Sequence, residues 1–271
     1  MKKVAIVVID TYPLNNLVRH AINETSKLPC VSSIYTFSKN PIVKGEIFHA
    51  IDGINSSSEY SDFVINVLPY FVNEEFALII QWDGFCINHS HWTNDFFNYD
   101  YIGSPWPGQP PELAVGNGGF SLRSRKLMKA GKNLKIIPND SSEIMQAEDQ
   151  LLCRVYRERL IESGVQFGTL EIANKFSFES TPILTTMGFH GAFNLPRVMS
   201  EDALIENIDE IILRISGASI MAMLIFNAYA LGKIEFATNL INKMRLIPDK
   251  NNALKTAFLT LNQPHFSNLF I

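Results

Sequence analysis

An aspartate stands at the point where an apolar stretch of the chain would end as a strand. Residues 77–81 read ALIIQ, which is typical of a buried strand, and Trp82, Asp83 and Gly84 follow directly. Ligands of open α/β sheets bind beyond the carboxyl ends of the strands. A carboxylate there, next to a glycine, can hold a hard cation, and such a cation holds phosphates. Asp83 is thus a candidate ligand, and the alternative is an aspartate that caps a loop.

A glycine-rich segment is the second candidate feature. Three of the four residues 116–119 are glycines, within the longer segment AVGNGGFSLRSRKLM. Missing side chains let backbone N–H groups approach a ligand closely. We expect a helix to begin just after the glycines, with Ser121 as its cap and Arg123 and Arg125 in its first turn. Cations oppose the helix dipole there, so a bound anion such as a diphosphate would account for them. The alternative is a glycine-rich turn with solvated arginines.

Two adjacent acids form the third feature. Glu148 and Asp149 precede apolar residues in the sequence QAEDQLLC. Acids near the start of a helix are favoured by the helix dipole, which is sufficient reason for their position. A carboxylate that faces a pocket could instead act as a general base. The residues themselves leave both interpretations open.

One histidine, His190, lies between two glycines in the loop sequence GFHG. The glycines would allow close approach to a bound group, although a single histidine is more often structural. His89 and His91 form a His-x-His pair near Asp83. They lie several residues beyond the end of the expected strand, so we favour His190 over this pair as a ligand.

These residues need a framework, and the first part of the chain predicts an α/β fold. Of the 271 residues, 46% are hydrophobic and 18% are charged, as in a globular protein. Residues 4–10 form a continuous apolar run, residues 14–28 carry helical spacing, and residues 32–39 predict a second strand. This alternation favours a mostly parallel sheet flanked by helices. Residues 76–82 predict a central strand, and residues 165–179 are also strand-like.

The last part of the chain predicts helices. Residues 200–262 have apolar side chains at helical spacing and include a helix pair joined at residues 231–233. We therefore expect an α/β domain over residues 1–198 and a helical domain over residues 199–271. Residues 215–232 carry no charge. They only reach the lower limit of a membrane-spanning helix, which favours a buried helix.

Charge and cysteine content argue against several classes of protein. A net charge of -4 and a pI near 5.9 provide no overall attraction to nucleic acid. The three cysteines are odd in number and have no metal-site spacing, so reduced thiols and a cytoplasmic location are expected. The first ten residues, MKKVAIVVID, contain an acid too early for a signal peptide and are expected to form a strand.

Five segments occur in a characteristic order: LIIQWDGF, YDYIGSPWP, VGNGGFSLRSRKLM, EDQLLC and GFHG. Together they resemble an uncharacterised, mostly bacterial family of glycosyltransferase-like domains, over about residues 3–195. That family looks like the GT-A type of nucleotide-sugar glycosyltransferase. The resemblance implies a Rossmann-like sheet, a nucleotide-diphosphate sugar donor such as a UDP-sugar, and a divalent cation, Mn²⁺ or Mg²⁺. The helical C-terminal part lies outside the resemblance.

The resemblance also implies roles for individual residues. GT-A enzymes bind the metal and the donor through an Asp-x-Asp motif, which corresponds here to Gln81, Trp82 and Asp83. The first acid is therefore replaced, and Asp83 remains as the metal ligand. His190 resembles the late histidine that completes the metal or diphosphate site in several such families. The implied donor-binding residues are Asp10, Thr11, Trp82, Asp83, Asn117, Gly118, Gly119 and Arg123.

A metal-assisted sugar transfer would use these parts together. Glu148 and Asp149 resemble the acid pair of inverting members, in which one acid takes the proton from the acceptor hydroxyl. The cation would stabilise the negative charge that gathers on the leaving diphosphate. The acceptor would be a glycan, a lipid-linked glycan or a protein. Trp82 or Trp106 could stack on a sugar ring, or could simply pack in the core.

Three questions stay open at this point. Gln81 in place of an acid is compatible with a non-catalytic module that binds a glycan or a nucleotide on the same scaffold. A nucleotidyltransferase would also use an acid at a strand end and a cation. The helical part could complete the core of the α/β domain, which we favour slightly. It could instead bind a partner, a second copy of the chain or the inner face of the membrane.

Overall fold

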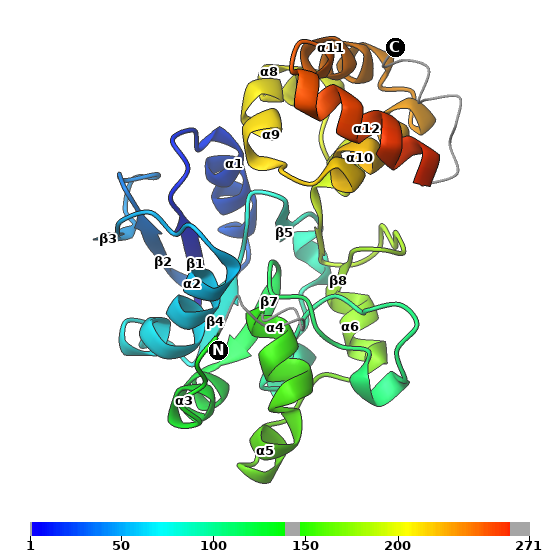
Figure 1. The fold of residues 1–271 in the computed structure, drawn as a ribbon. Coiled ribbons are helices and arrows are strands. Elements are labelled where there is room, and N and C mark those ends of the chain that lie inside the picture. The colour runs from blue at the N-terminus through cyan, green and yellow to red at the C-terminus, as the bar shows by residue number, and fades with distance from the viewer. Residues whose placement is uncertain (1, 139–146, 261–271) are drawn as a thin grey trace. The chain divides into compact units, whose positions relative to one another are not determined.

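The computed structural model describes residues 2–138 and 147–260 and contains a six-stranded and a three-stranded sheet (Figure 1). The strand order in the larger sheet is β3-β2-β1-β4-β7-β6. The pairs β1–β2, β1–β4 and β2–β3 are parallel, whereas β4–β7 and β6–β7 are antiparallel. The strands of this sheet are β1 (Val4–Asp10), β2 (Val31–Ser38), β3 (Ile47–Ala50), β4 (Phe76–Ile79), β6 (Tyr101–Ile102) and β7 (Ser121–Ser124).

Helices accompany this sheet along the chain, as the sequence predicts. They are α1 (Asn16–Thr25), α2 (Ser57–Asp62), α3 (Arg125–Asn133), α4 (Glu148–Gln150), α5 (Arg157–Glu162) and α6 (Leu170–Phe176). A π-helical turn, Phe63–Val67, and a 3-10 turn, Leu68–Tyr70, continue α2, and a second π-helical turn, Leu151–Val155, continues α4. The predicted class, a mostly parallel α/β sheet flanked by helices with a helical C-terminal part, is confirmed.

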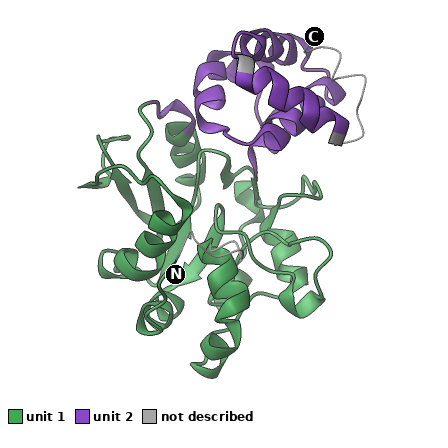
Figure 2. Ribbon diagram, viewed as in Figure 1, with its two compact units in different colours: residues 1–13, 18–190 green, residues 14–17, 191–271 purple. Residues whose placement is uncertain are grey.

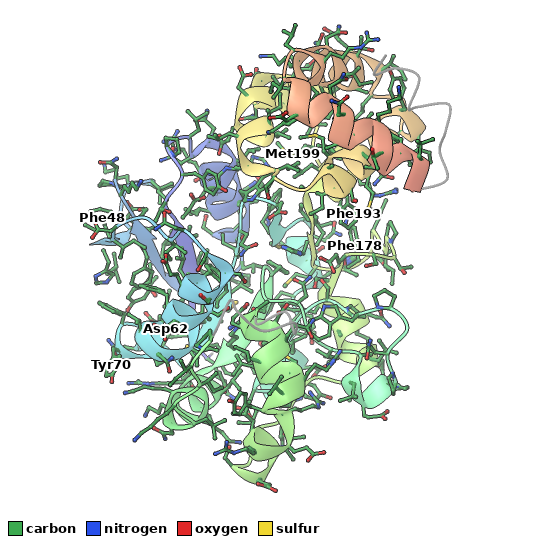
Figure 3. All side chains as sticks on the ribbon, in the orientation of Figure 1. Phe48, Asp62, Tyr70, Phe178, Phe193 and Met199 are labelled. Atoms are coloured by element: carbon green, nitrogen blue, oxygen red, sulfur yellow. The ribbon has the colours of Figure 1, made fainter. Side chains whose placement is uncertain are left out.

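The core of the larger sheet explains why β1 is a continuous apolar run. Ala5 and Val7 of β1 pack with Phe37 of β2 and Ile79 of β4, and all four are fully buried. A strand covered on both faces has no solvent-facing position, so it carries no polar alternation. The turns after α2 cover this cluster, whereas Tyr70 at their end is exposed (Figure 3). The three cysteines are buried and form no disulfide with one another.

A smaller sheet brings two distant segments together. It consists of β5 (Gly84–Cys86), β9 (Gly188–His190) and β8 (Ser177–Phe178), in the order β5-β9-β8. Strands β5 and β9 are antiparallel, and their register places Gly84 opposite His190. The residue that follows Asp83 in the chain is therefore a strand partner of His190.

Contacts group the chain into two compact units, coloured separately in Figure 2. The first contains residues 1–13 and 18–190, and the second contains residues 14–17 and 191–271. The sequence predicts a division after residue 198, whereas this grouping starts the helical part at Gly191. The helices of the second unit are α7 (Leu195–Val198), α8 (Glu201–Glu206), α9 (Ile208–Arg214), α10 (Ala218–Ala230), α11 (Ile234–Arg245) and α12 (Pro248–Thr260).

The uncharged segment of the second unit contains helix α10, which packs against α11 and α12. Leu224, Ile225 and Ala228 of α10 are fully buried. The predicted joint at residues 231–233 connects α10 to α11. Across the described ranges 2–138 and 147–260, the structure contains no helix with the length and apolar character needed to cross a membrane.

Two short elements of the first unit differ from the sequence prediction. Residues 121–124 form strand β7 rather than the start of a helix, and all four are buried. Helix α3 begins after Ser124, whose Oγ accepts a hydrogen bond from the Leu127 backbone nitrogen at 3.1 Å. Residues 170–176, expected to be strand-like, form helix α6. Thr169 caps it by accepting a bond from the third helical residue at 3.3 Å.

Candidate active site

The turn after β4 presents Trp82 and Asp83 at the carboxyl end of the strand. The backbone nitrogen of Ile80 still bonds to Val7 of β1, at 3.1 Å. Gln81 and Gly84 then exchange two backbone hydrogen bonds, of 3.0 and 3.1 Å, and close a tight turn around the two residues between them. The side chain of Asp83 is largely buried. The strand end predicted from the sequence is therefore where the acid lies.

His190 faces this turn from strand β9. Its Nε2 lies 3.9 Å from Asp83 Oδ1 and 3.3 Å from Gln81 Oε1, and its Nδ1 lies 2.9 Å from Glu179 Oε1. Burial by itself lowers the pKa of His190, but the carboxylates of Asp83 and Glu179 outweigh it and raise the pKa to about 9. The structure thus brings Asp83 and His190 together, as the sequence predicts for two ligands of one group.

Asn117 joins the same cluster from the glycine-rich loop. Its backbone φ is +65°, which is uncommon outside glycine. The Tyr101 hydroxyl donates a hydrogen bond to the Asn117 carbonyl at 3.0 Å, and Asn117 Nδ2 lies 3.0 Å from His190 Nδ1. The amide is buried, with 4% of the residue exposed. The strained backbone therefore directs this side chain at the histidine.

The glycines of the loop are required by protein side chains on both sides of it. A Cβ on Gly118 would lie 1.8 Å from Glu148 Oε1, and a Cβ on Gly119 would lie 2.0 Å from His190 Nε2. The Gly118 nitrogen donates a hydrogen bond to Asp149 Oδ2 at 2.9 Å. The sequence predicts close approach of a ligand here, and the structure shows close approach of the two acids and His190.

Arg123 lies in a different setting from the one predicted. It belongs to strand β7, not to the first turn of a helix, and only 1% of it is exposed. Its Nη2 donates to Glu148 Oε1 at 2.5 Å and its Nε donates to Ser121 Oγ at 3.0 Å. The guanidinium also lies 5.3 Å from the centre of the Tyr101 ring. Its contacts therefore hold Glu148, and its predicted contact with a donor stays a prediction.

The two acids of α4 differ in their environments. Glu148 is buried and paired with Arg123. Asp149 is partly exposed and accepts hydrogen bonds from the backbone nitrogens of Gly118 and Gln150. Burial, followed by repulsion from the Glu148 carboxylate, raises the pKa of Asp149 to about 6. Such a carboxylate can accept a proton near neutral pH, whereas Glu148 is already neutralised by a cation.

Two other predicted residues, Asp10 and Thr11, lie at the carboxyl end of β1. Asp10 Oδ1 accepts a hydrogen bond from the Tyr12 nitrogen at 2.9 Å, and Thr11 Oγ1 accepts one from the Ile54 nitrogen at 3.2 Å. Strands β1 and β4 are parallel neighbours, so these residues and Asp83 share one edge of the sheet. Their predicted contact with the nucleotide base stays a prediction.

The His-x-His pair contacts backbone carbonyls. His89 Nε2 lies 2.8 Å from the Glu24 carbonyl, and His91 Nδ1 contacts the Thr185 carbonyl. These contacts fix the loop after β5.

Sequence reasoning missed two members of the cluster. Glu179 directly follows the short strand β8, so an acid at a strand end was a signal that could have found it. Tyr60, on α2, accepts a hydrogen bond from Gln81 Nε2 at 3.2 Å. No local pattern marks Tyr60, because it reaches Gln81 through the fold. The Gln81 side chain thus contacts both Tyr60 and His190. At the position where the GT-A motif has its first acid, it links these two residues.

A divalent cation fits Asp83 and His190 on the chemistry of the donor set. A ligating histidine usually donates its other ring N–H to a carboxylate, a backbone carbonyl or water, and Glu179 is placed to accept it at His190 Nδ1. Mg²⁺ is commonly held by one or two carboxylates and completes its shell with water and phosphate oxygens. Within residues 2–138 and 147–260, no group of three or more His, Cys, Asp or Glu residues is arranged to hold a metal ion by itself.

Comparison with proteins of known structure gives distant likenesses. A synthetase for CMP:2-keto-3-deoxy-manno-octonic acid, solved with CTP, is similar at 12% identity and a TM-score of 0.37, covering 62% of this chain and 91% of that one. The apo glycosyltransferase GlyE of Streptococcus pneumoniae TIGR4 is similar at 12% identity and a TM-score of 0.41. That match covers 69% of this chain and 54% of GlyE, so this chain spans about half of that protein.

The sequence comparisons identify the family. No curated protein matches the chain. Residues 46–190 match a family described as "Protein of unknown function (DUF5672)", and they include Asp83, the glycine-rich loop, both acids of α4 and His190. Because this match spans more than half of the 271 residues, the protein belongs to the DUF5672 family.

Proposed function

We propose that the protein transfers a sugar from a nucleotide-diphosphate donor, a UDP-sugar, to a hydroxyl group of a glycan, a lipid-linked glycan or a protein. The observation that supports this most is the arrangement around the loop of Asn117, Gly118 and Gly119. On one side of this loop His190 faces Asp83 at a strand end, and on the other side Asp149 has a raised pKa. A charge-stabilising group and a general base thus flank one loop.

Asp83 and His190 would hold a divalent cation, Mn²⁺ or Mg²⁺. When bound, the cation would supply positive charge for the diphosphate that leaves the sugar. Glu179 keeps the His190 ring in place through Nδ1, and Gln81 contacts the other ring nitrogen. Asp10, Thr11, Trp82 and Asn117 would contact the donor, because they lie in the turns at this edge or within the loop.

Asp149 is the base that we favour over Glu148. The Arg123 guanidinium holds Glu148 in a buried ion pair, so proton transfer to Glu148 would break that pair. Asp149 is bound only by backbone N–H groups in the contacts described, and it is partly exposed. It would take the proton of the acceptor hydroxyl as the oxygen attacks the sugar. Glu148 and Arg123 would then serve to hold Asp149 in place.

Hydrolysis of a UDP-sugar in the presence of Mn²⁺ or Mg²⁺ tests the proposal. The Asp83→Ala variant should hydrolyse the donor at least roughly a hundredfold more slowly. It removes a ligand of the cation that would stabilise the leaving diphosphate. Asp52→Ala is the matched control, because Asp52 is an exposed acid in the loop after β3. Unchanged hydrolysis in Asp83→Ala would remove Asp83 from the site. No binding of any nucleotide sugar to the wild type would refute the enzymatic proposal.

Two alternatives are separated by other readouts. A nucleotidyltransferase would use the same strand-end acid and a cation, and it would release pyrophosphate from a nucleoside triphosphate. A non-catalytic module would bind a sugar nucleotide in calorimetry without turnover and without dependence on a cation. The replacement of an acid by Gln81 is weak support for such a module, because Gln81 contacts His190 and Tyr60 in the structure.

A further inference from the structure

Two arginines beyond the acids of α4 are stacked on aromatic rings. Arg154 lies in the π-helical turn after α4, and its guanidinium carbon is 4.1 Å from the centre of the Trp106 ring. Arg157 begins α5, and its guanidinium carbon is 4.0 Å from the centre of the Phe167 ring. The two arginines repel each other enough to contribute to a lowered pKa in Arg154. They therefore form a cationic pair on one short stretch of chain.

Both guanidinium groups have a buried nitrogen that donates no hydrogen bond. In the part of the chain that the structure describes, Arg154 Nη2 and Arg157 Nη1 have no acceptor. Burial lowers the pKa of each of these arginines. Arg154 and Arg157 are themselves partly exposed, whereas the buried arginines Arg123 and Arg214 are each paired with a glutamate. A buried donor without an acceptor destabilises the fold, so these two nitrogens need an explanation, such as a ligand that accepts their hydrogen bonds.

Arg154, one member of the stacked pair, lies close to the candidate active site. Arg154 follows Asp149 by five positions and is electrostatically coupled to it. Trp106 is packed so tightly against Gly116 that a Cβ there would lie 2.3 Å from the ring. Gly116 directly precedes Asn117, so Trp106 supports both the glycine-rich loop and Arg154. A group held by Arg154 would therefore lie near the proposed base.

We propose that Arg154 and Arg157, with Trp106 as the support of Arg154, form a subsite for a carboxylate or phosphate group of the acceptor. An arginine fork held flat by an aromatic ring is preorganised for two parallel hydrogen bonds to such an anion. The unpaired nitrogens provide the donors. The assignment to the acceptor rests on the proposed transferase function, whereas the anion site itself rests on the two arginines. The acceptor is accordingly an acidic sugar or a phosphorylated one.

Thermal unfolding of the full chain with inorganic phosphate tests the anion site. Phosphate is compared with sodium chloride at equal ionic strength, in the presence of saturating UDP and Mg²⁺, so that the donor site is not the one that is measured. We expect phosphate to raise the Tm of the wild type and of the control Lys129→Gln, which removes an exposed cation of α3. Arg154→Gln and Arg157→Gln should each weaken phosphate binding by roughly tenfold or more.

A second variant separates this subsite from the donor site. Asp83→Ala should keep a stabilisation by phosphate that the further change Arg154→Gln removes, because Asp83 has no part in the arginine pair. Arg154→Lys should bind phosphate less well than the wild type, since an ammonium group lacks the planar fork. Equal stabilisation of wild type and both glutamine variants would overturn the anion site. If the wild type does not act on any UDP-sugar, the proposed function fails, and the phosphate comparison still decides the anion site.

Competition identifies the source of the anion. Glucuronate and glucose 1-phosphate carry the two anionic groups on a sugar, and glucose is the neutral control. Either charged sugar should compete with phosphate in the wild type, and glucose should not. Phosphate binding that neither charged sugar reduces would overturn the assignment to the acceptor.

Discussion

At the scale of single residues, the environment of Asp149 predicts a pH dependence. Its pKa is raised to about 6 by burial and by Glu148. A base must be ionised to accept a proton, so the rate of transfer should rise about tenfold per pH unit up to about 6 and level off above it. Asp149→Asn should lower kcat by about 10²–10⁴-fold, and Asp52→Asn should not. A rate that is constant from about pH 5 to 7 would contradict this role for Asp149.

The glycines of the loop predict a second effect at this scale. Gly118→Ala and Gly119→Ala would place a methyl group into Glu148 and His190, at the short distances described above. Overpacking of this kind costs about 1–3 kcal/mol of unfolding free energy and would displace the candidate ligands. Gly217→Ala is a control, because its Cβ would meet nothing closer than 3.7 Å. The unfolding free energy measured in urea and the rate of donor hydrolysis should both fall in the two loop variants. Both should be unchanged in the control.

Local sequence signals point to several individual residues of the candidate site. Asp83 and His190 are marked by adjacent glycines, and the Glu148–Asp149 pair is marked by its position before an apolar run. These are local signals. The link between Glu179 and His190 depends on strand pairing between β8 and β9, and the link between Tyr60 and Gln81 depends on packing of α2 near β4. Such links join segments whose spacing in the chain carries no information about contact.

At the scale of elements, the sequence does not predict strand β7, because the strand contains a charged residue and two serines. Its sequence is Ser-Leu-Arg-Ser, and all four residues are buried. A strand buried on both faces is recognised by a continuous apolar run, and Arg123 interrupts this one. The arginine is stabilised in the core by its ion pair with Glu148, which lies on another element. The seven-residue helix α6 was mistaken for strand because two turns display too little of the helical period.

The ion pair between β7 and α4 predicts a large effect on stability. Arg123→Met leaves Glu148 as a buried charge without its cation, which should lower the unfolding free energy by about 3–5 kcal/mol. Arg123→Met combined with Glu148→Met should recover much of this loss, because no charge is then left unpaired. Equilibrium unfolding in urea measures both variants. The single variant Glu148→Met completes the comparison. If the loss of unfolding free energy in the double variant equals the sum of the losses in the two single variants, the two side chains act independently.

At the scale of the whole molecule, the helical unit includes four residues from the start of the chain. Glu210 of α9 accepts hydrogen bonds from the backbone nitrogens of Asn16, at 2.9 Å, and Leu17, at 3.3 Å. Arg214 donates to Glu210 at 2.9 Å and to the Leu14 carbonyl at 2.6 Å. The start of α1 is thus capped by a carboxylate from another helix, which satisfies donors that a helix leaves unpaired.

Removal of this carboxylate should destabilise the protein. Glu210→Ala removes the carboxylate that pairs with the buried guanidinium of Arg214 and should lower the unfolding free energy by about 3–5 kcal/mol. Glu206→Ala, at an exposed position on α8, should have little effect. A chain that ends at residue 198 also lacks Glu210 and should unfold at a lower Tm than the full chain. Equal stability of the Glu210→Ala and Glu206→Ala variants would contradict the capping role.

The same cap has a consequence for synthesis of the chain. Asn16 and Glu210 are separated by 194 positions. At roughly 5–20 residues per second, the ribosome adds Glu210 about 10–40 s after Asn16. For that interval the first turn of α1 has no carboxylate to accept its N–H groups, while the strands on either side of it are already outside the ribosome. The cap on α1 can therefore form only after α9 has been synthesised, and a chain that stops before residue 210 lacks its carboxylate.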